Sequence, residues 1–227
     1  MKKNQKISLI VLPILILVSL FLISLPFDHY FSSSPKNNSD QASSESFNDI
    51  FSSLSVPIIG SANAPVTIIA FNDYQCKDCK TWYDNEYPKI SKELIDTQKA
   101  NMVFLDSTPL GTDSILISEA TYCANEQEKY SEYQEILFNS QQEIDAWAKS
   151  EQLKIFAVDL ELDLKSFEEC LDSETFKDDV LSNIEFAKSY GIDRIPVFKI
   201  VNFEGREHVL KGSLPSMIFE DVVNRFQ

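Results

Sequence analysis

Residues 66–80 read VTIIAFNDYQCKDCK and decide the fold. Val66–Asn72 is a nearly continuous apolar run rich in β-branched side chains, which is typical of a strand buried on both faces. Helix-compatible sequence follows from about Cys76 to Leu94, and a second apolar run, Met102–Leu105, comes after it. This strand–helix–strand order predicts a parallel pair of strands joined by a right-handed crossover.

A helical block follows the second strand. No strand pattern occurs between Asp113 and Tyr190, and the sequence predicts helices at about 114–126, 129–140, 146–158, 164–171 and 174–190. Asp163 and Ser173 are candidate N-caps for the last two of these helices. Gly191 is a candidate stop for the final one, because glycine readily adopts the left-handed conformation found at helix ends.

The C-terminal part predicts a hairpin and one more helix. Val197–Val201 and His208–Lys211 flank a short turn that contains Gly205, which indicates an antiparallel pair. The last helix is amphipathic, with an apolar stripe of Ile218, Val222 and Phe226 and with Phe219 and Val223 beside it. The whole order predicts an α/β domain over residues 56–227 with a helical insertion at about 113–190.

Cys76 and Cys79 are the residues that carry chemistry. The pair lies where the first strand becomes a helix, so the unpaired N–H groups and the dipole of the helix should stabilise a thiolate on Cys76. Cys79 lies one turn further on the same face, where it can close a disulfide or attack a mixed disulfide formed by Cys76. The end of a strand is also where α/β proteins usually place their sites. We therefore favour a redox pair.

Two alternatives to a redox pair are open. Half of a zinc site would need two more ligands, and Cys123 and Cys170 would have to converge on the pair across the helical block. An inert structural disulfide is the second alternative. His29 and His208 lie in no ligand-like cluster, and we expect neither a metal nor a cofactor.

Three segments resemble the DsbA-like thiol–disulfide oxidoreductases of the thioredoxin superfamily. The first is Gly60–Cys79, which leads into the cysteine pair, and the second is GIDRIPVF at Gly191–Phe198. The third is GSLPS at Gly212–Ser216, before the last helix. The resemblance spans about Pro57 to Gln227 and implies a thioredoxin-like fold, with which the helical insertion agrees.

The resemblance also implies roles for single residues. Cys76 would be the nucleophile, Cys79 the resolving thiol and Pro196 a cis-proline that faces the pair. Ile195, which precedes that proline, would lend its backbone to an extended substrate chain.

This sequence departs from the family pattern at two places. The family often has a buried acid six residues before the first cysteine, where this chain has Ala70, so that Asp73, Asp78 or water would have to accept the proton of Cys79. Lys77 and Asp78 separate the cysteines in place of the usual proline-containing pair, and their effects on the thiolate oppose each other. The sequence therefore leaves the redox potential open.

Cys123 and Cys170 form a second candidate pair. Some members of the family have a second disulfide inside the insertion, and by this resemblance we expect a structural bridge here. Such a bridge would stabilise the fold by roughly 2–4 kcal/mol. Two separate buried thiols, packed as small hydrophobic residues, are the alternative.

The N-terminus predicts a membrane anchor. Residues 7–26 carry no charge and are long enough to span a bilayer as a helix, and Lys2, Lys3 and Lys6 precede them. We expect a cytoplasmic tail at 1–6, a transmembrane signal anchor at 7–26 and a flexible linker at 27–55, with the domain outside the cytoplasm. A cleaved signal peptide is the alternative.

Charge and composition limit the classes of partner. The formal net charge is −15, from 20 Lys and Arg against 35 Asp and Glu, which argues against nucleic-acid binding. The leading hypothesis is a membrane-anchored oxidase that gives disulfides to reduced, unfolded secreted or surface proteins and is recycled by a membrane redox partner. A disulfide reductase or isomerase, and a non-catalytic thioredoxin-fold binding module, are the alternatives.

Overall fold

The computed structural model describes residues 56–107, 110–111, 113–141 and 146–227. The predicted tail (1–6), membrane segment (7–26) and linker (27–55) lie outside the described residues. Within the described ranges, no helix is both long and apolar enough to cross a membrane.

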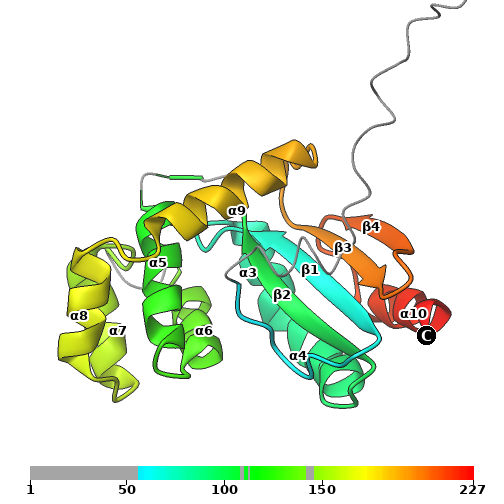
Figure 1. The fold of residues 1–227 in the computed structure, drawn as a ribbon, viewed down its shortest axis with the longest axis horizontal. Helices are drawn as coiled ribbons and strands as arrows, with labels where there is room; N and C mark the ends of the chain where they lie inside the picture. The colour runs from blue at the N-terminus through cyan, green and yellow to red at the C-terminus, as the bar shows by residue number, and fades with distance from the viewer. Residues whose placement is uncertain (1–55, 108–109, 112, 142–145) are drawn as a thin grey trace, which may run out of the picture. The chain divides into compact units, whose positions relative to one another are not determined.

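A four-stranded sheet in the order β2–β1–β3–β4 lies at the centre of the domain (Figure 1). Strand β1 (Val66–Asn72) pairs in parallel with β2 (Ala100–Asp106). On its other side β1 pairs antiparallel with β3 (Val197–Asn202), which in turn pairs antiparallel with β4 (Glu207–Lys211). The predicted parallel pair and the predicted hairpin are therefore both confirmed.

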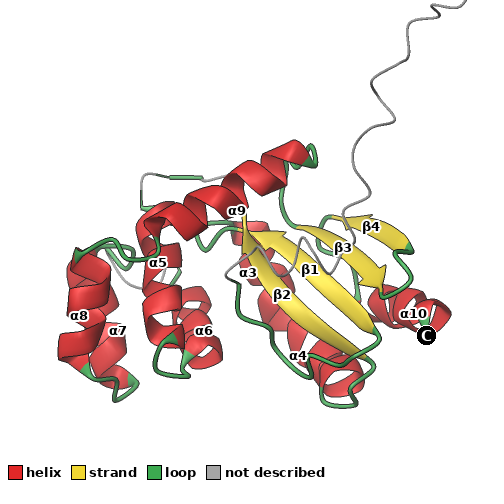
Figure 2. Cartoon of the chain, in the orientation of Figure 1, coloured by secondary structure: helices red, strands yellow, loops and turns green. Residues whose placement is uncertain are grey.

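The two faces of β1 enter different cores, which explains its nearly continuous apolar sequence. Ile68 and Ala70 pack in the larger core with the helix that follows the strand. Ile69 and Phe71 pack on the opposite face with Ala187, which belongs to α9 (Lys177–Ser189). Figure 2 shows helices on both sides of the sheet. Side chains on both faces must be apolar when both faces are covered.

The crossover from β1 to β2 is not the single helix that the sequence predicts. It consists of α3 (Lys77–Asn85), α4 (Tyr87–Ile90) and a π-helical turn, η2 (Ser91–Ile95). Pro88 explains the first break, because proline lacks an N–H group and is tolerated only in the first turn of a helix. It occupies that place in α4.

The predicted helical insertion is confirmed. Its helices are α5 (Ser114–Asn125), α6 (Tyr130–Ser140), α7 (Ser150–Asp159), α8 (Leu164–Asp172) and α9. Asp163 caps α8 as expected, since its Oδ1 accepts a hydrogen bond of 2.9 Å from the backbone N–H of Ser166. Gly191 follows the end of α9 with a φ of +67°, which is the conformation expected of a helix stop.

Two details of the predicted helices are wrong. Ser173 caps no N-terminus: it ends α8, where its hydroxyl donates a 2.6 Å hydrogen bond to the carbonyl of Glu169. In α10 (Ser216–Phe226), Ile218 is 38% exposed and lies off the buried stripe. That stripe consists of Phe219, Val222, Val223 and Phe226. It faces the sheet, where the rings of Phe219 and Phe198 meet at 4.8 Å.

Candidate active site

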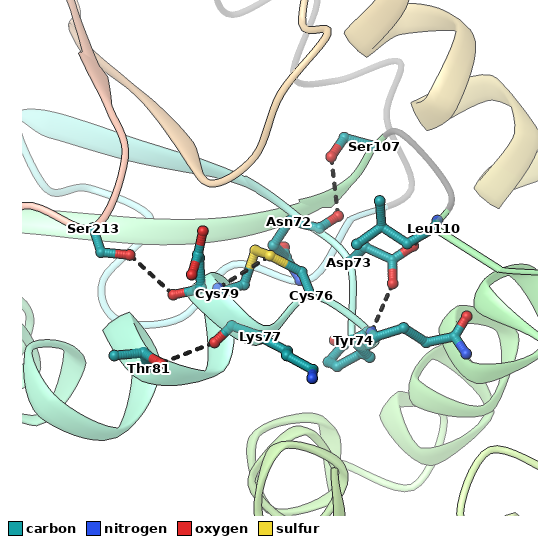
Figure 3. Close-up of a disulfide and its surroundings, with 12 residues drawn as sticks. Asn72, Asp73, Tyr74, Cys76, Lys77, Cys79, Thr81, Ser107, Leu110 and Ser213 are labelled. Carbon is teal, nitrogen blue, oxygen red and sulfur yellow. Dashed lines mark hydrogen bonds between the residues drawn. A yellow bond between two sulfur atoms is a disulfide. The ribbon is translucent and has the colours of Figure 1, made fainter. Parts of the chain in front are cut away.

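The site is centred on a disulfide between Cys76 and Cys79, whose Cα atoms are 5.2 Å apart (Figure 3). Cys76 is the N-cap of α3, as the sequence predicts. Its Sγ accepts a hydrogen bond of 3.1 Å from the backbone N–H of Cys79. The sulfur thus lies at the positive end of a helix dipole, where a thiolate is favoured after reduction.

The turn between β1 and α3 is held by Asp73. Its backbone carbonyl accepts from the N–H of Cys76 at 3.0 Å. Its carboxylate accepts from the N–H of Gln75 at 2.7 Å and from that of Leu110 at 3.1 Å. Burial raises the pKa of this carboxyl above its ordinary value, although these donors oppose the shift. Asp73 therefore ties the cysteine turn to the loop that follows β2.

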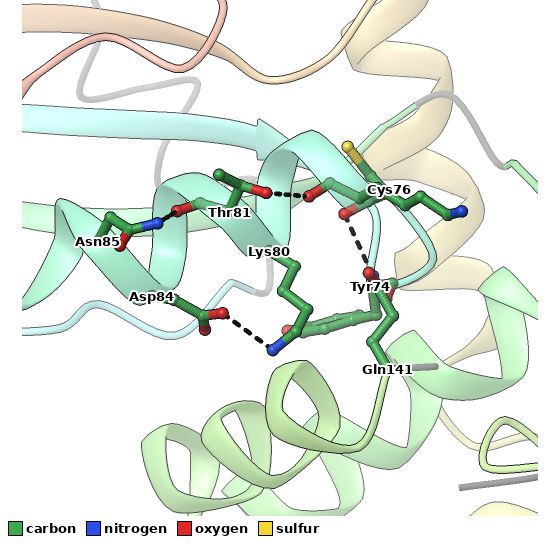
Figure 4. A network of polar contacts seen from close by, with 8 residues as sticks. Tyr74, Cys76, Lys80, Thr81, Asp84, Asn85 and Gln141 are labelled. Carbon is green, nitrogen blue, oxygen red and sulfur yellow. Dashed lines mark hydrogen bonds and ion pairs between the residues drawn. The ribbon is translucent and has the colours of Figure 1, made fainter. Parts of the chain in front are cut away.

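Gln141 fixes the same turn from the helical insertion (Figure 4). Its Nε2 donates to the carbonyl of Tyr74 at 2.6 Å and to the carbonyl of Cys76 at 3.1 Å. Gln141 directly follows α6, so the insertion contributes to the geometry of the cysteine pair.

Pro196 directly precedes β3, on a loop beside Cys76, and the Ile195–Pro196 peptide bond is cis. The Pro196 carbonyl accepts a hydrogen bond of 2.9 Å from the N–H of Gly212. A groove of about 520 Å³ joins this loop to Cys76. Its lining residues are Cys76, Lys77, Asp78, Leu110, Asp193, Arg194 and Ile195.

A second, larger groove of about 790 Å³ continues from the first. Both grooves share Asp193–Ile195 in their linings, and the larger one then extends over β3 and β4. Along it Lys199 lies over the ring of Tyr190, with 4.4 Å from Nζ to the ring centroid. The two grooves together provide a mixed apolar and charged surface that leads to Cys76.

The two aspartates nearest the cysteine pair differ in their surroundings. Asp73 is engaged in the turn, and Asp78 is exposed, with its carbonyl accepting from Ser213 Oγ at 3.0 Å. A different buried acid, Asp106, lies at the end of β2, paired with Asn72 in the sheet.

Asp106 is held by hydroxyl groups. Ser118 Oγ donates to it at 2.6 Å and Tyr122 OH at 2.9 Å, and Asn183 Nδ2 donates to the same tyrosine oxygen at 2.9 Å. Burial raises the pKa of Asp106 to about 6, against the effect of these donors. The network connects β2, α5 and α9.

Cys123 and Cys170 are joined by a disulfide between α5 and α8, with a Cα–Cα distance of 5.8 Å. Cys123 is buried and Cys170 is half-buried. Trp82 is buried in the core, with its ring centroid 4.4 Å from that of Phe198. In the part of the chain that the structure describes, no cluster of three or more His, Cys, Asp or Glu residues is placed to hold a metal.

Asn72, Asp106 and Gln141 were not predicted as site residues from the sequence. Gln141 is 65 residues from Cys76, and no local pattern joins the two. Asn72 and Asp106 end two strands that the sequence predicts, so the polar residue at the end of each apolar run was the available signal.

Comparison with known proteins gives a consistent result. A family model described as Thioredoxin matches residues 53–209, well over half of the chain. The probable disulfide bond formation protein D of Bacillus cereus is 27% identical over 155 residues, which are 66% of this chain and 71% of that protein. Disulfide bond formation protein D of Bacillus subtilis is 26% identical over 148 residues, 63% of this chain and 67% of that protein.

Solved structures show the same fold. Oxidised BdbD from Bacillus subtilis superposes with a TM-score of 0.66 and 24% identity, over 75% of this chain and 92% of that one. Alpha-DsbA1 from Wolbachia pipientis has a TM-score of 0.68 and 22% identity, over 76% of this chain and 90% of that one.

Proposed function

Because this chain belongs to the thioredoxin family and is a DsbA-like thiol–disulfide oxidoreductase, we propose that it is a membrane-anchored oxidase of secreted or surface proteins. The observation that carries the proposal is the Cys76–Cys79 disulfide at the N-terminus of α3. The names of the curated relatives, disulfide bond formation proteins, support the direction of electron flow.

The reaction is two successive thiol–disulfide exchanges. A substrate thiolate attacks Cys76 Sγ, the Cys76–Cys79 bond breaks, and its electron pair leaves on Cys79 as a thiolate. A second substrate thiolate then attacks the substrate sulfur of the mixed disulfide and releases Cys76 as a thiolate. The substrate loses two electrons and two thiol protons; the enzyme gains the electrons, and the protons pass to its thiolates or to solvent.

Helix α3 favours this direction. The N–H of Cys79 and the dipole of the helix stabilise the negative charge that returns to Cys76 in the second exchange. A stabilised thiolate is a better leaving group and makes the reduced enzyme more stable, which makes the disulfide a stronger oxidant.

The grooves beside Ile195 and Pro196 suit an extended, unfolded substrate chain. They run from Cys76 along the loop before β3, so a bound chain would lie along Ile195 with its cysteine near the disulfide. In this proposal Ile195 offers backbone hydrogen bonds, Pro196 holds the loop, and the Cys123–Cys170 bridge has a structural role.

The anchor and the recycling partner rest on the sequence. We assign residues 1–6 to the cytoplasm, 7–26 to the membrane, 27–55 to a linker and 56–227 to the extracytoplasmic domain. A membrane redox partner would reoxidise Cys76 and Cys79 after each turnover. After cell fractionation the full chain should remain with membranes through an alkaline wash, and a chain lacking residues 7–26 should not. Release of the full chain by the wash would contradict the anchor.

The test of the enzyme uses the full chain in detergent with reduced, unfolded ribonuclease as substrate. The oxidised protein should restore ribonuclease activity, whereas Cys76→Ser and Cys79→Ser, neither of which can form the Cys76–Cys79 disulfide, should both be inactive. Equilibration with glutathione then gives the reduction potential. A value near thioredoxin's, about −270 mV, would favour the reductase or isomerase instead. A wild-type protein without exchange activity would favour the binding module.

A further inference from the structure

Asn72 carries a buried amide that has no hydrogen bond. It is the last residue of β1 and only 4% exposed. Neither its Nδ2 nor its Oδ1 has a partner among the residues that the structure describes, whereas its backbone carbonyl accepts two hydrogen bonds from Ser107. An unpaired buried amide is unfavourable, and a redox or catalytic role is one of the reasons for which such groups persist.

The amide lies on the face of β1 that carries the cysteine pair. Successive side chains of a strand alternate between its faces, so Asn72 shares a face with Ala70. Ala70 packs in the same buried cluster as Cys76 and Cys79. Figure 3 shows Asn72 among the residues that surround the disulfide. The unpaired amide is thus at the end of the strand from which the cysteine turn begins.

The two sulfurs differ in their hydrogen bonding. Cys76 Sγ accepts from the backbone N–H of Cys79 at 3.1 Å. Cys79 Sγ, in a residue only 2% exposed, receives none of the hydrogen bonds found in the described part of the chain. In a disulfide this matters little, because such a sulfur is a weak acceptor. A buried thiolate on Cys79 would need a donor.

We propose that Asn72 Nδ2 donates a hydrogen bond to Cys79 Sγ once the disulfide is reduced. The first exchange breaks the Sγ–Sγ bond and leaves its electron pair on Cys79, which becomes a strong acceptor. The amide is then unpaired only in the oxidised protein and paired in the reduced one. Asn72 therefore shifts the equilibrium toward the reduced enzyme and makes the disulfide more oxidising. This inference rests on the proposed function.

The Asn72 amide cannot do the same chemistry as a carboxyl group on the same face of the strand. The position where related proteins often hold a buried acid is Ala70 here, two residues before Asn72 on the same side of the strand. An amide donates a hydrogen bond but does not take up a proton. Asn72 would therefore stabilise the Cys79 thiolate without titrating. The proton that the Cys79 thiol loses when it attacks a mixed disulfide must go to another acceptor.

The test compares Asn72→Leu with the wild type, both as full chains, in equilibrium with reduced and oxidised glutathione. Leucine is similar in size to asparagine and cannot donate. We expect the equilibrium constant for oxidising glutathione to fall about tenfold, the usual effect of one hydrogen bond to a charged group, which is about 30 mV for this two-electron couple. An unchanged potential would overturn the inference.

Two further variants separate this role from a structural one. Asn72→Ser keeps a donor in a smaller side chain, and its potential should lie between those of the wild type and Asn72→Leu. Asn101→Leu is the matched control. Asn101, in β2, is also 4% exposed and also has an unpaired side-chain oxygen. It lies opposite Thr67 in the strand register, at the other end of the sheet from Asn72. Asn101→Leu should lower the unfolding free energies of the oxidised and reduced proteins equally and leave the potential unchanged.

If Asn101→Leu shifted the reduction potential as much as Asn72→Leu, Asn72 would have only a packing role. The same would follow if Asn72→Leu destabilised the oxidised and reduced proteins equally. The same glutathione equilibrations test the proposed function independently of this inference. The oxidase direction depends on the wild-type potential, whereas this inference depends only on the difference between variant and wild type.

Discussion

At the scale of single residues, the site contains polar groups whose state depends on burial. Asp106 is enclosed with the hydroxyls of Ser118 and Tyr122, and burial raises its pKa from 3.8 to about 6. A raised folded-state pKa means that the neutral carboxyl is the form that folding favours. The group therefore makes the stability of the fold depend on pH in a predictable direction.

The direction of this pH dependence follows from whether the folded or the unfolded chain loses the Asp106 proton first. The unfolded chain loses this proton near pH 4 and the folded chain only near pH 6, so Asp106 destabilises the fold progressively between these values, by about 3 kcal/mol in all. Asp106→Asn cannot ionise and should lack this loss. Measured by denaturant unfolding, the difference between the variant's and the wild type's unfolding free energy should rise by about 3 kcal/mol from pH 3 to pH 7. A difference that stays constant over this range would contradict the assignment.

A control for this prediction removes one donor and keeps the acid. Tyr122→Phe deletes a hydrogen bond to the ionised carboxylate, so the pKa of Asp106 should rise further. The pH range over which stability is lost should then extend above pH 6.

At the scale of elements, hydrogen bonds from the insertion and from the loop after β2 hold the cysteine turn. Gln141, which follows α6, donates to the carbonyls of Tyr74 and Cys76. Asp73 joins the same turn to the loop after β2 through Leu110. The turn is thus held from two elements that lie outside the strand–helix unit carrying the cysteines.

Gln141→Leu should affect both stability and exchange. It leaves two carbonyls of the cysteine turn without this donor, and we expect the unfolding free energy to fall by about 1–3 kcal/mol. The rate of ribonuclease oxidation should fall as well, because the turn positions Cys76. The matched control is Gln127→Leu, since Gln127 also bridges backbone groups, those of Asp163, but away from the site. It should cost stability and leave the oxidation rate unchanged; equal losses of rate would refute the role of Gln141.

The disulfide between α5 and α8 belongs to the same scale. Replacing both Cys123 and Cys170 by Ser opens a loop whose ends are 47 residues apart and should lower the unfolding free energy by about 2–4 kcal/mol. The reduction potential of the Cys76–Cys79 pair should stay the same if the bridge is only structural. A shift in that potential would reveal coupling between the two disulfides.

At the scale of the whole domain, aromatic packing joins the insertion to the thioredoxin core. The ring of Phe138, on α6, is 4.3 Å from that of Tyr83 on α3 and 5.2 Å from that of Tyr74 in the cysteine turn. Burial of these rings raises the pKa of both tyrosines well above the ordinary value. The contact places the two parts of the domain in one continuous core.

Phe138→Ala should therefore affect both the stability of the domain and the activity of the cysteine site. We expect a loss of about 3–5 kcal/mol in unfolding free energy, together with slower ribonuclease oxidation under conditions where the variant is still folded. Phe167→Ala is the matched control, because Phe167 is equally buried but packs on Tyr133 within the insertion. It should lose comparable stability with little change in rate. If both variants oxidised ribonuclease equally well, the contact would not be needed to position the site.

Local sequence patterns were enough to predict the order of elements and the place of the cysteine pair. Those features depend on local patterns: the apolar run of β1, the cysteine spacing at the start of α3, and the glycine that ends α9. Each can be recognised within a few residues, because strand burial, helix capping and turn conformation are set largely by neighbouring side chains.

The surroundings of the two sulfurs depend on long-range packing. Gln141 reaches the cysteine turn from 65 residues away, and the network at Asp106 joins residues from β2, α5 and α9. The unpaired state of the Asn72 amide also appears only when every neighbour is in place. Hydrogen bonds and desolvation depend on which groups meet in space, and distant segments meet only through the packing of the whole domain.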